Sequence, residues 1–505
     1  MPQSNVNRRD FLKSTAVGAT ALSLTAASAK RVFGANERIG IAFLGTGGRC
    51  QEHIRIITKM QKANKGVAAV AVCDVWDGNK KVGRGLYPSA EKCGLNHDDK
   101  EHVSKDYRRV LDLKDVDVVC IAAPDHWHAK LSIDAAAAGK DVYCEKPMTK
   151  TIDEAQAVVD AMQKHNRVMT VGVQSMADPT WHKANELIRS GRIGHVAQAQ
   201  TSYYRNSAMG QWRYYPLTKD MNPQTVDWDM FLGHQFNVLP GVPLGPQIPF
   251  DRAVYGQWRC YWPFGGGMFT DLFVHQTTHM IAAMGVRYPA RVVGGGGIYV
   301  EYDERDVPDV ATVVADYNEG CQLIITATMI NDHPIEECIR GKLGTIRFIT
   351  RNKEAGFEIL PQNVRDAPGT PVRLDNKEGE FIPGGLVGED TAALWTDFLD
   401  HVRSHNRETL STPELGAAAF TTVNMGVLSY RKGNVLFWDK EQRKPVVADS
   451  SWADNWEKRS KEHGKPNQIM GWNGGVIGSL LTPPSYQKLG GPWVNGKDPA
   501  EGAAG

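Results

Sequence analysis

The chain has 505 residues. It contains 58 Lys and Arg and 57 Asp and Glu, so its formal net charge at pH 7 is +1. This balance gives no electrostatic reason to expect nucleic acid or an anionic membrane as a partner. Hydrophobic residues make up 42% of the chain and charged residues 23%, which is typical of a globular protein. The length exceeds one ordinary core, so we expect two domains with appendages.

The first 29 residues have the pattern of an export signal. Arg8-Arg9 precede an apolar run that extends from Ala16 to Ala27, and a small-residue cleavage pattern ends at Ala29. Residues 7–13 are similar to the twin-arginine consensus. We therefore predict that 1–29 is a twin-arginine signal peptide and that the protein is exported to the periplasm; the alternative is a fraying amphipathic N-terminus. No later run is apolar enough to span a bilayer.

The eight cysteines are scattered and lack the spacing of a zinc site or of a disulfide framework. Several lie within apolar runs, where Cys behaves as a small hydrophobe. We interpret them as structural and expect no metal.

A buried strand at 38–44, a glycine turn and a helix from about 51 to 60 follow one another. In this order, the glycines let the backbone approach a pyrophosphate that lies on the helix N-terminus. The third glycine position of the fingerprint holds Cys50 instead. The turn residues, which we predict to bind a cofactor, are Gly45, Thr46, Gly47, Gly48 and Arg49.

The next strand, 67–73, ends in Asp74. An acidic side chain there accepts the hydroxyls of an adenosine ribose and repels a 2′-phosphate, which favours NAD over NADP. Lys80, Lys81 and Arg84 keep NADP open, and Asp74 as a simple turn cap is the alternative.

Further strands at 117–123, 142–144 and 168–173 alternate with helices at 133–138 and 153–165, the latter capped by Thr151 or Asp153. This alternation predicts an α/β, Rossmann-type doubly wound parallel sheet. We expect the NAD(P)-binding domain to occupy residues 38–175.

The strand 142–144 is stopped by Pro147, which fixes φ and lacks a ladder donor. Glu145 and Lys146 are therefore expected at the carboxyl end of a strand, where ligands bind in open α/β sheets.

From His195 onward strand-like runs follow one another without intervening helices, which predicts an α+β domain on a largely antiparallel or mixed sheet over 176–445. The Pro- and Trp-rich stretch 206–264 is too long for an idle loop and is expected to form a wall or lid of a site. Helices are expected at 392–404 and 415–430. The tail, 446–505, has no periodicity.

A Gly-rich stretch leads into Asp271, His275 and His279. On one helix these residues share a face, and a carboxylate one turn from an imidazole can orient a general base. A solvated Asp-His pair is the alternative. The two His lack the intervening Glu of a metalloprotease helix and a third ligand, which disfavours zinc.

Several motifs occur in a fixed order: the glycine turn, Asp74, the stretch 123–128 (Ala-Pro-Asp-His-Trp-His), 145–147 (Glu-Lys-Pro) and the Gly-rich entry to Asp271 and His275. In this order they resemble the glucose-fructose oxidoreductase / inositol dehydrogenase / rhizopine-catabolism (Gfo/Idh/MocA) family over about residues 38–440. The stretch 226–233 resembles an exported, signal-bearing branch of it.

The resemblance implies roles by position. Lys146 matches the lysine near the nicotinamide and the reacting hydroxyl, Asp271 the carboxylate that holds that hydroxyl, and His275 the general acid/base. Glu145 and Pro147, together with Pro124 and His128, match the cofactor pocket. Where members often carry a second Asp, this chain has Thr278, followed by His279.

Aromatic faces stack on sugars and Arg forks bind hydroxyls. On this basis we nominate a substrate wall, for which ordinary packing is the alternative: Tyr203, Tyr204, Arg205, Trp212, Arg213, Trp258, Arg259, Trp262 and His279.

The interpretation that follows is an NAD(P)-dependent oxidoreductase acting on the CH–OH group of a sugar, glycoside or polyol. Because the exported compartment offers little free cofactor, we expect tightly bound NAD. The resemblance also implies a homo-oligomer, a dimer or tetramer. The alternatives are an NAD-dependent glycosidase or lyase that works through a transient keto-sugar, and a non-catalytic sugar-binding relative.

Overall fold

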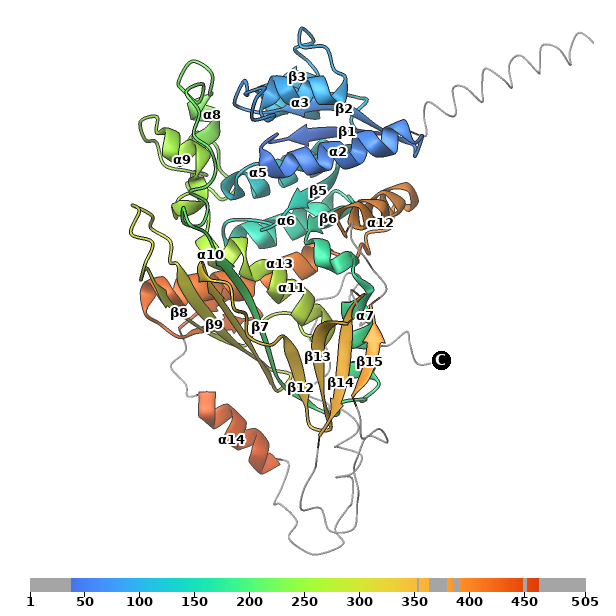
Figure 1. Cartoon of the computed structure of the whole chain (residues 1–505), viewed down its shortest axis with the longest axis vertical. Helices are drawn as coiled ribbons and strands as arrows, with labels where there is room; N and C mark the ends of the chain where they lie inside the picture. Colours follow the sequence, from blue (N-terminus) through green and yellow to red (C-terminus); the bar gives the residue numbers. More distant parts are fainter. Residues whose placement is uncertain (1–37, 352–353, 363–378, 385–389, 448–451, 463–505) are drawn as a thin grey trace, which may run out of the picture.

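The computed structural model describes residues 38–351, 354–362, 379–384, 390–447 and 452–462. The predicted signal peptide and most of the predicted tail lie outside these residues. Within them, a parallel sheet and a larger mixed sheet lie at opposite ends of the molecule, with helices between them (Figure 1). The predicted fold class, a Rossmann sheet followed by an α+β domain, is confirmed.

The parallel sheet has six strands in the order β3-β2-β1-β4-β5-β6. Its strands are β1 (Ile39–Leu44), β2 (Val67–Cys73), β3 (Val103–Ser104), β4 (Val118–Ile121), β5 (Asp141–Glu145) and β6 (Met169–Gly172). Every residue of β1, β4, β5 and β6 is buried, because helices cover both faces, and these strands read as continuous apolar runs. The order reverses at β1, so the carboxyl ends of β1 and β4 form the switch point where ligands bind.

The helices of this part are α2 (Gly48–Lys62), α3 (Leu86–Cys93), α4 (Tyr107–Leu111), α5 (Asp125–Ala137) and α6 (Ile152–Lys164). Helix α6 begins with a capping box, in which the Thr151 side chain and Glu154 bond each other's backbone N–H groups. Helix α5 is longer than the sequence pattern indicated. The stretch 125–128, expected as a turn after the strand, forms its first turn.

The second sheet has eleven strands and is mixed. Strand β7 pairs parallel with β10, whereas the other recorded pairs in this sheet are antiparallel. Its strands are β7 (Val196–Asn206), β8 (Arg291–Gly297), β9 (Val310–Tyr317), β10 (Cys321–Thr328), β11 (Ile330–Asn331), β12 (Cys338–Gly341), β13 (Gly344–Arg351), β14 (Glu354–Pro361), β15 (Glu380–Pro383), β16 (Leu436–Asp439) and β17 (Lys444–Val446). Burial alternates strictly along β10, because helices cover only one of its faces.

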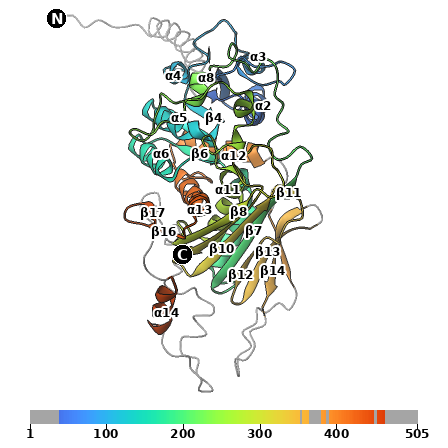
Figure 2. The ribbon, with the colours of Figure 1, turned by 90° about the vertical axis from the view of Figure 1, so that its left-hand side faces the viewer.

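Helices cover one face of this sheet, and Figure 2 shows the other face open. The elements are η1 (Gln174–Ala177), α7 (Pro179–Arg189), α8 (Trp228–Leu232), α9 (Arg252–Gly256), η2 (Trp258–Cys260), α10 (Gly267–Asp271), α11 (Phe273–Met284), α12 (Asp390–Ser404), α13 (Pro413–Lys432) and α14 (Trp452–Glu462). Helix α14 corrects the expectation of a tail without regular structure. No helix among the described residues is long and apolar enough to cross a membrane.

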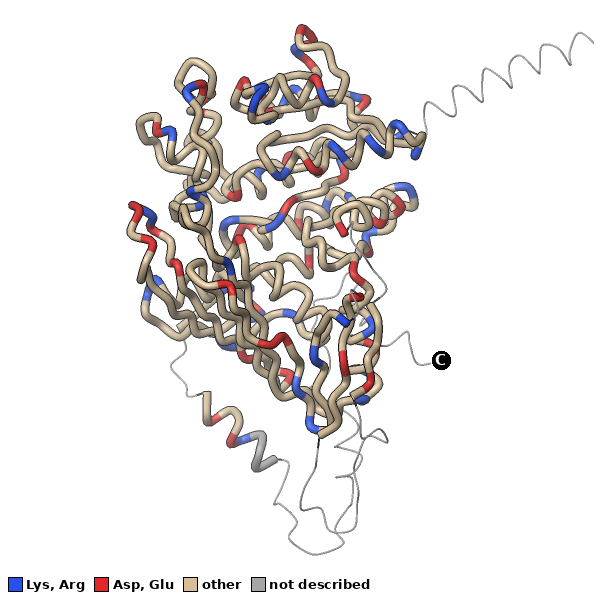
Figure 3. The backbone as a smooth tube through the Cα atoms, viewed as in Figure 1, with Lys and Arg blue, Asp and Glu red and all other residues tan. Residues whose placement is uncertain are grey.

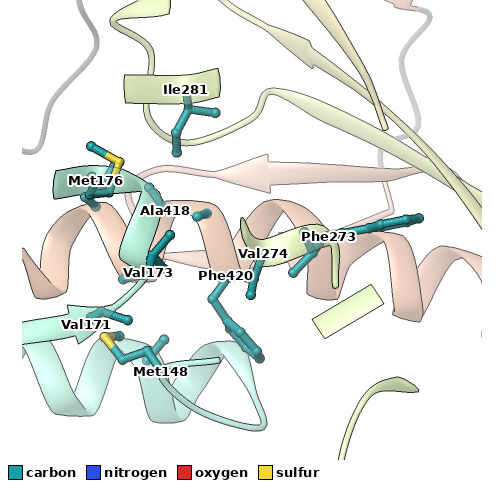
Figure 4. Packing of buried hydrophobic residues seen from close by; sticks show 14 of the residues in the cluster. Met148, Val171, Val173, Met176, Phe273, Val274, Ile281, Ala418 and Phe420 are labelled. Atoms are coloured by element: carbon teal, nitrogen blue, oxygen red, sulfur yellow. The ribbon is translucent and has the colours of Figure 1, made fainter. Parts of the chain in front are cut away.

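Two late helices pack against the N-terminal sheet. Helix α13 lies between the two sheets, and Figure 4 shows its Ala418 and Phe420 among Met148 and Val171 on one side and Phe273 on the other. Helix α12 packs on the parallel sheet, where the Trp395 and Tyr143 rings stack 4.3 Å apart. The order of the chain therefore does not separate the two cores. Lys and Arg are interspersed with Asp and Glu along the backbone (Figure 3).

Candidate active site

A cavity extends along the carboxyl ends of the parallel strands toward the second sheet. Gly45, Gly47 and Arg49 line one part of it, and Trp258 and Arg259 line the part nearest the C-terminal domain. Two chemically different ends of one cavity suit a ligand with a phosphate-bearing half and a reacting half.

The glycine turn is shaped to hold a phosphate-bearing ligand. Gly45 has φ +82°, and a Cβ there would lie 2.5 Å from the Ala123 Cα, so a side chain is excluded by both conformation and space. Gly47 is the N-cap of α2 and provides no capping side chain. A Cβ at Gly47 would meet nothing within 4 Å, so the first N–H groups of α2 are open to an anion. These residues fit NAD.

Asp74 lines the cavity and also fastens the glycine turn. Its Oδ2 accepts hydrogen bonds from the Thr46 N–H at 2.6 Å and the Thr46 hydroxyl at 3.1 Å, and its Oδ1 accepts from the Trp76 N–H at 2.9 Å. Burial raises the pKa of Asp74, although these hydrogen bonds oppose the shift. Arg84 and Lys105 line the same part of the cavity.

Residues 215–230 of the insertion form a segment that we call the clamp. It reaches from the C-terminal part of the chain to the loop after β2, where the Asp227 N–H donates to the Val75 carbonyl at 2.8 Å. The Trp76 indole donates to the Asp220 carbonyl at 3.1 Å, and Trp76 forms a β-bridge with Val226. Figure 1 shows the adjoining helices α8 and α9 beside the N-terminal domain.

Several clamp side chains close one wall of the cavity: Tyr215, Met221 and Met230. The expectation that 206–264 is a wall is therefore met in both parts of the cavity, because Trp258 and Arg259 of the same stretch line the part nearest the C-terminal domain.

Lys146 and Asp271 meet at the reacting end. Lys146 follows β5, and its Nζ lies 2.8 Å from both the carbonyl oxygen and the Oδ1 of Asp271, which ends α10. The side chains are 14% and 8% exposed, so the pair is largely shielded from water. This contact joins the two halves of the chain.

Asp271 also accepts from two further donors, the Arg259 Nε at 3.1 Å and the Trp212 Nε1 at 3.2 Å. Burial alone would raise the pKa of Asp271, but Lys146 and Arg259 outweigh it and hold the pKa far below the ordinary value. Asp271 is therefore an ionised anchor that fixes the Lys146 ammonium in place.

His275 does not share a continuous helix with Asp271, which corrects the expectation of one helical face. Leu272 separates α10 from α11 at φ −107°, and the Asp271 carboxylate binds Lys146, Arg259 and Trp212 rather than the imidazole. The His275 ring instead lies 6.1 Å from the Tyr203 ring at an interplanar angle of 29°. Burial, followed by the charge of Lys146, lowers the pKa of His275 to about 3, so the ring is neutral at pH 7 and able to accept a proton.

Asp125 is an active-site carboxyl that the sequence reasoning did not nominate. It is 2% exposed and lies in the first turn of α5. Burial raises its pKa to about 8; Arg259 opposes this shift and Asp271 adds to it. Its place directly after Pro124, at the carboxyl end of β4, is the signal that could have identified it.

Residues 39–173 match the model of an oxidoreductase family with an NAD-binding Rossmann fold. The matched model is that of the Gfo/Idh/MocA family, so the N-terminal domain is similar to that family. The match covers the glycine turn, Asp74 and Lys146, so these residues are assigned to a dinucleotide-binding domain by both geometry and kinship.

Curated relatives of this chain include dehydrogenases and glycosidases. A levoglucosan dehydrogenase of Pseudarthrobacter phenanthrenivorans is 36% identical over 161 residues, 30% of this chain and 41% of the relative. An inositol 2-dehydrogenase of Salmonella typhimurium is 28% identical over 176 residues, 35% and 47% of the two chains. An alpha-N-acetylgalactosaminidase of Shewanella oneidensis is 25% identical over 255 residues, 43% and 51%. The chain spans about half the length, or less, of the curated relatives it matches.

Among solved structures, the WlbA dehydrogenase of Bordetella pertussis, in complex with NADH and UDP-GlcNAcA, superposes with a TM-score of 0.55. The superposition covers 80% of this chain and 99% of that chain at 17% identity. The likeness in fold therefore covers both sheets of this chain.

Glu145, expected at the cofactor pocket, lies in a buried network behind the glycine turn. Its Oε1 accepts from the Arg49 Nε at 2.7 Å and lies 3.0 Å from the His53 Nε2. The Trp395 indole donates to the His53 Nδ1, which leaves Nε2 as the donor to Glu145. Burial would raise the pKa of Glu145, but Arg49 and His53 hold it well below the ordinary range. Arg49 thus touches the cavity while anchored by Glu145.

The other predicted cofactor residues surround the strand ends. Pro124 lines the cavity as the N-cap of α5. His128 is buried beneath, with its Nδ1 2.6 Å from the Pro147 carbonyl and its Nε2 2.8 Å from the Ala123 carbonyl. The hydrogen bond between His128 and the Pro147 carbonyl therefore fixes the backbone that follows β5.

The nominated substrate wall divides into residues at the site and residues away from it. Trp258 and Arg259 line the cavity, and Tyr203 with Arg205 lies beside His275. Trp212 is 1% exposed, so it supports Asp271 and presents no open face to a sugar.

Three other nominees are placed elsewhere. Tyr204 follows Tyr203 on β7 and so points to the opposite face of the sheet, because side chains alternate along a strand. Arg213 is held by Asp303, and Trp262 packs under Arg431 at 5.0 Å. For these three, a substrate contact is not supported by their position.

His279 belongs to a separate buried cluster one turn beyond His275. Its Nε2 lies 3.0 Å from the Glu337 Oε1, its Nδ1 lies 3.2 Å from the Ser175 hydroxyl, and its ring stacks on Trp181 at 3.8 Å. Both ring nitrogens are thus engaged by protein groups. Glu337 and Ser175 were not singled out by the sequence.

The eight cysteines are all buried and unbonded to one another, as small hydrophobes are. Across the described ranges, no three His, Cys, Asp or Glu side chains gather in a way that could hold a metal ion.

Proposed function

We propose that this protein is an NAD-dependent oxidoreductase acting on the CH–OH group of a sugar or polyol. The observation that carries the proposal is the 2.8 Å contact between Lys146 and Asp271, whose carboxylate also accepts from Arg259, a lining residue of the cavity that begins at the glycine turn. A positioned ammonium and a neutral imidazole, next to a nucleotide site, make a proton-transfer set that a simple sugar binder does not require. The names of the dehydrogenase relatives support the same substrate class.

Bound NAD supplies the hydride acceptor in this chemistry. The first N–H groups of α2 would hold its pyrophosphate, and Asp74, which lines the cavity, would accept the hydroxyls of its adenosine ribose. A carboxylate at that position repels a 2′-phosphate, which favours NAD over NADP. Of the cations that argued for NADP, Lys80 pairs with Glu91 at 3.2 Å, and Arg84 remains at the cavity.

The chain's own residues hold and move the proton. Lys146 donates a hydrogen bond to the reacting oxygen and stabilises negative charge that develops there, in a site largely shielded from water. Asp271 fixes the ammonium, and Arg259 and Trp212 fix Asp271. His275, uncharged at neutral pH, takes the hydroxyl proton.

The clamp supports tight retention of the cofactor. Its backbone and side chains bond the loop after β2 at Val75, Trp76 and Asp77, and Met221 packs in a buried cluster with Trp76. Release of the adenosine half requires these contacts to loosen. We propose that NAD stays bound between two half-reactions. One substrate reduces the bound cofactor, and a second substrate oxidises it again.

Export to the periplasm through a twin-arginine signal is a further part of the proposal and is supported by the sequence of residues 1–29. That route carries folded, cofactor-loaded proteins, which is consistent with a retained nucleotide. The check is fractionation of cells that express the full chain, compared with an Arg8→Lys, Arg9→Lys variant. Cytoplasmic location of both proteins would contradict export.

The first experiment is the absorbance spectrum and released-nucleotide mass of the purified, unsupplemented protein, before and after a panel of sugars is added. We expect bound NAD whose absorbance at about 340 nm grows with one class of sugar. Protein that holds no nucleotide, even after incubation with NAD and NADP, would refute the oxidoreductase and favour a non-catalytic sugar binder.

A second candidate function is an NAD-dependent glycosidase that oxidises a ring hydroxyl, eliminates the aglycone and restores the sugar. The observation in its favour is the 255-residue alignment with an alpha-N-acetylgalactosaminidase, which extends beyond the N-terminal domain. Release of 4-nitrophenol from nitrophenyl glycosides without net NADH would support it. Accumulating NADH without aglycone release would support the dehydrogenase.

A further inference from the structure

The reacting end of the cavity carries more positive than negative charge. Two cationic side chains bind Asp271, Lys146 at 2.8 Å and Arg259 at 3.1 Å, and the charge of Asp271 raises the pKa of a third, Arg205. Lys146 and Arg259 share the same carboxylate oxygen, Oδ1 of Asp271. One carboxylate therefore serves as counter-ion for the whole group.

Arg205 lies beside the Tyr203 ring, which in turn lies near His275. It follows Tyr203 by two residues on β7, and its guanidinium stacks 4.8 Å from the Tyr203 ring centroid while its Nη2 donates to the Tyr203 hydroxyl at 2.5 Å. The same Tyr203 ring lies 6.1 Å from the His275 ring. Burial would lower the pKa of Arg205, but Tyr203, Tyr214 and Asp271 raise it overall. Arg205 therefore stays charged and interacts electrostatically with Asp271.

Arg205 has no acidic partner among the residues that the structure describes, in contrast to other arginines of the same region. Arg213 pairs with Asp303 at 3.0 Å, and Arg305 pairs with both Asp303 and Glu301. Away from the cavity, the arginines of the insertion and of the loop before β9 thus have acidic partners. Arg205, beside His275, has no such partner among the described residues.

Arg259 offers donors to the cavity as well. Its Nε is used by Asp271, while its guanidinium lies 4.2 Å from the Trp258 ring centroid and lines the cavity. The side chain is 24% exposed, so its terminal N–H groups are open to a ligand. A guanidinium with free terminal donors binds a carboxylate or phosphate in a bidentate manner.

The second acidic side chain at this end adds no charge near neutral pH. Asp125 is deeply buried and its pKa is raised to about 8, so the carboxyl is protonated at pH 7 and acts as a donor. Glu145 is already matched by Arg49 at 2.7 Å. The excess positive charge is therefore not cancelled within the site.

We propose that the substrate is an anionic sugar, a sugar acid whose carboxylate is held by Arg205 and Arg259 while its hydroxyl reacts between Lys146 and His275. This inference rests on the proposed oxidoreductase function and names its substrate class. A carboxylate fits because the Arg259 guanidinium lines the cavity, and a second guanidinium, Arg205, and the protonated Asp125 both interact electrostatically with Asp271, the partner of Arg259. A sugar phosphate offers the same anionic chemistry, and the test separates the two.

The test compares matched substrates on the NAD-loaded protein: glucose with glucuronate, galactose with galacturonate, and glucose 6-phosphate as the phosphate arm. Reduction of bound NAD is followed by absorbance. We expect kcat/KM for the favoured uronate to exceed that for its neutral partner by about tenfold or more, since a hydrogen bond to a charged group contributes that much. The KM for the uronate rises with salt, because partly exposed charges are screened, and the KM for the neutral sugar does not.

Variants assign the effect to Arg205. Arg205→Gln removes the charge and retains a donor, and we expect KM for the uronate to rise about tenfold or more, with the uronate-to-neutral ratio of kcat/KM falling by a similar factor. Arg205→Lys restores most of the uronate preference. The control is Arg192→Gln, which removes an arginine paired with Glu380 in the C-terminal domain and leaves both substrates unaffected.

Binding gives a readout that does not depend on turnover. In the NADH-loaded protein, glucuronate raises the melting temperature and glucose at the same concentration does not, and Arg205→Gln abolishes the difference. Equal kcat/KM for neutral and anionic sugars, or equal loss of both in Arg205→Gln, would overturn the inference and leave the oxidoreductase intact. Preference for glucose 6-phosphate over every uronate would overturn the carboxylate assignment. If no sugar reduces NAD but glucuronate still gives the Arg205-dependent shift, the anionic site stands and the oxidoreductase falls.

Discussion

Asp125 makes the stability of the nucleotide-free protein depend on pH in a way that one substitution removes. Its pKa in the folded protein is about 8, whereas an exposed Asp in the unfolded chain titrates near ~3.9. Between these values the native state keeps a proton that the unfolded state has lost. The free energy of unfolding therefore falls as pH rises, and the loss is complete only above pH 8.

The magnitude follows from the width of that window. From pH 5 to pH 7 the single proton costs the wild type about 2–3 kcal/mol of stability, because each pH unit is worth about 1.4 kcal/mol. Asp125→Asn is nearly isosteric, keeps a donor and cannot ionise. We expect the variant to lose about 2–3 kcal/mol less than the wild type over the same interval, since the other titrating groups are common to both proteins.

Equilibrium urea unfolding of nucleotide-stripped wild type and Asp125→Asn at pH 5, 6 and 7 measures the difference. Asp98, an exposed acid in a turn, supplies the control, and Asp98→Asn should follow the wild-type pH dependence. Parallel pH dependence of Asp125→Asn and wild type would refute the reasoning, because it would mean that Asp125 is ionised in the folded protein at neutral pH.

Three further outcomes are expected. Lys146→Met lowers kcat by about 10²-fold or more while the Kd for NADH, measured by fluorescence, changes by less than about threefold; unchanged turnover would exclude its role. Gly45→Ala destabilises the protein by more than about 2 kcal/mol in urea unfolding, because φ is +82° and a Cβ would lie 2.5 Å from Ala123. The matched Gly47→Ala, whose Cβ meets nothing within 4 Å, keeps the wild-type midpoint, and equal effects of the two would contradict this account. Met221→Ala loosens the clamp and speeds release of NADH, followed by stopped-flow fluorescence against a trap; an unchanged release rate would argue against retention by the clamp.

The nucleotide-binding half could be predicted because its signals are local. A strand buried on both faces is a continuous apolar run, and β2 has the bounds that the sequence indicated. The capping box at Thr151 and the glycine turn can likewise be recognised from residues that are close together in the sequence. Short elements with weak periodicity, such as β3 and α4, gave no such signal and were not anticipated.

The expected helical face of Asp271 and His275 failed for a physical reason. A spacing of four residues predicts that two side chains lie close together only if the helix is continuous. Here the helix is interrupted at Leu272, between α10 and α11. The break lets the Asp271 carboxylate face Lys146 instead of the imidazole. Tertiary ion pairing therefore overrode the local pattern.

By itself, the sequence determined the class of fold, the place of the dinucleotide turn and most of the side chains at its reacting end, although not Asp125. Only the tertiary structure decided how they are used. It paired Lys146 with Asp271 across 125 positions, buried Asp125 until its carboxyl keeps a proton, and gave Arg205 no acidic partner among the residues that the structure describes. Ionisation and charge balance depend on burial and on neighbours distant in sequence, and neither is encoded in local spacing.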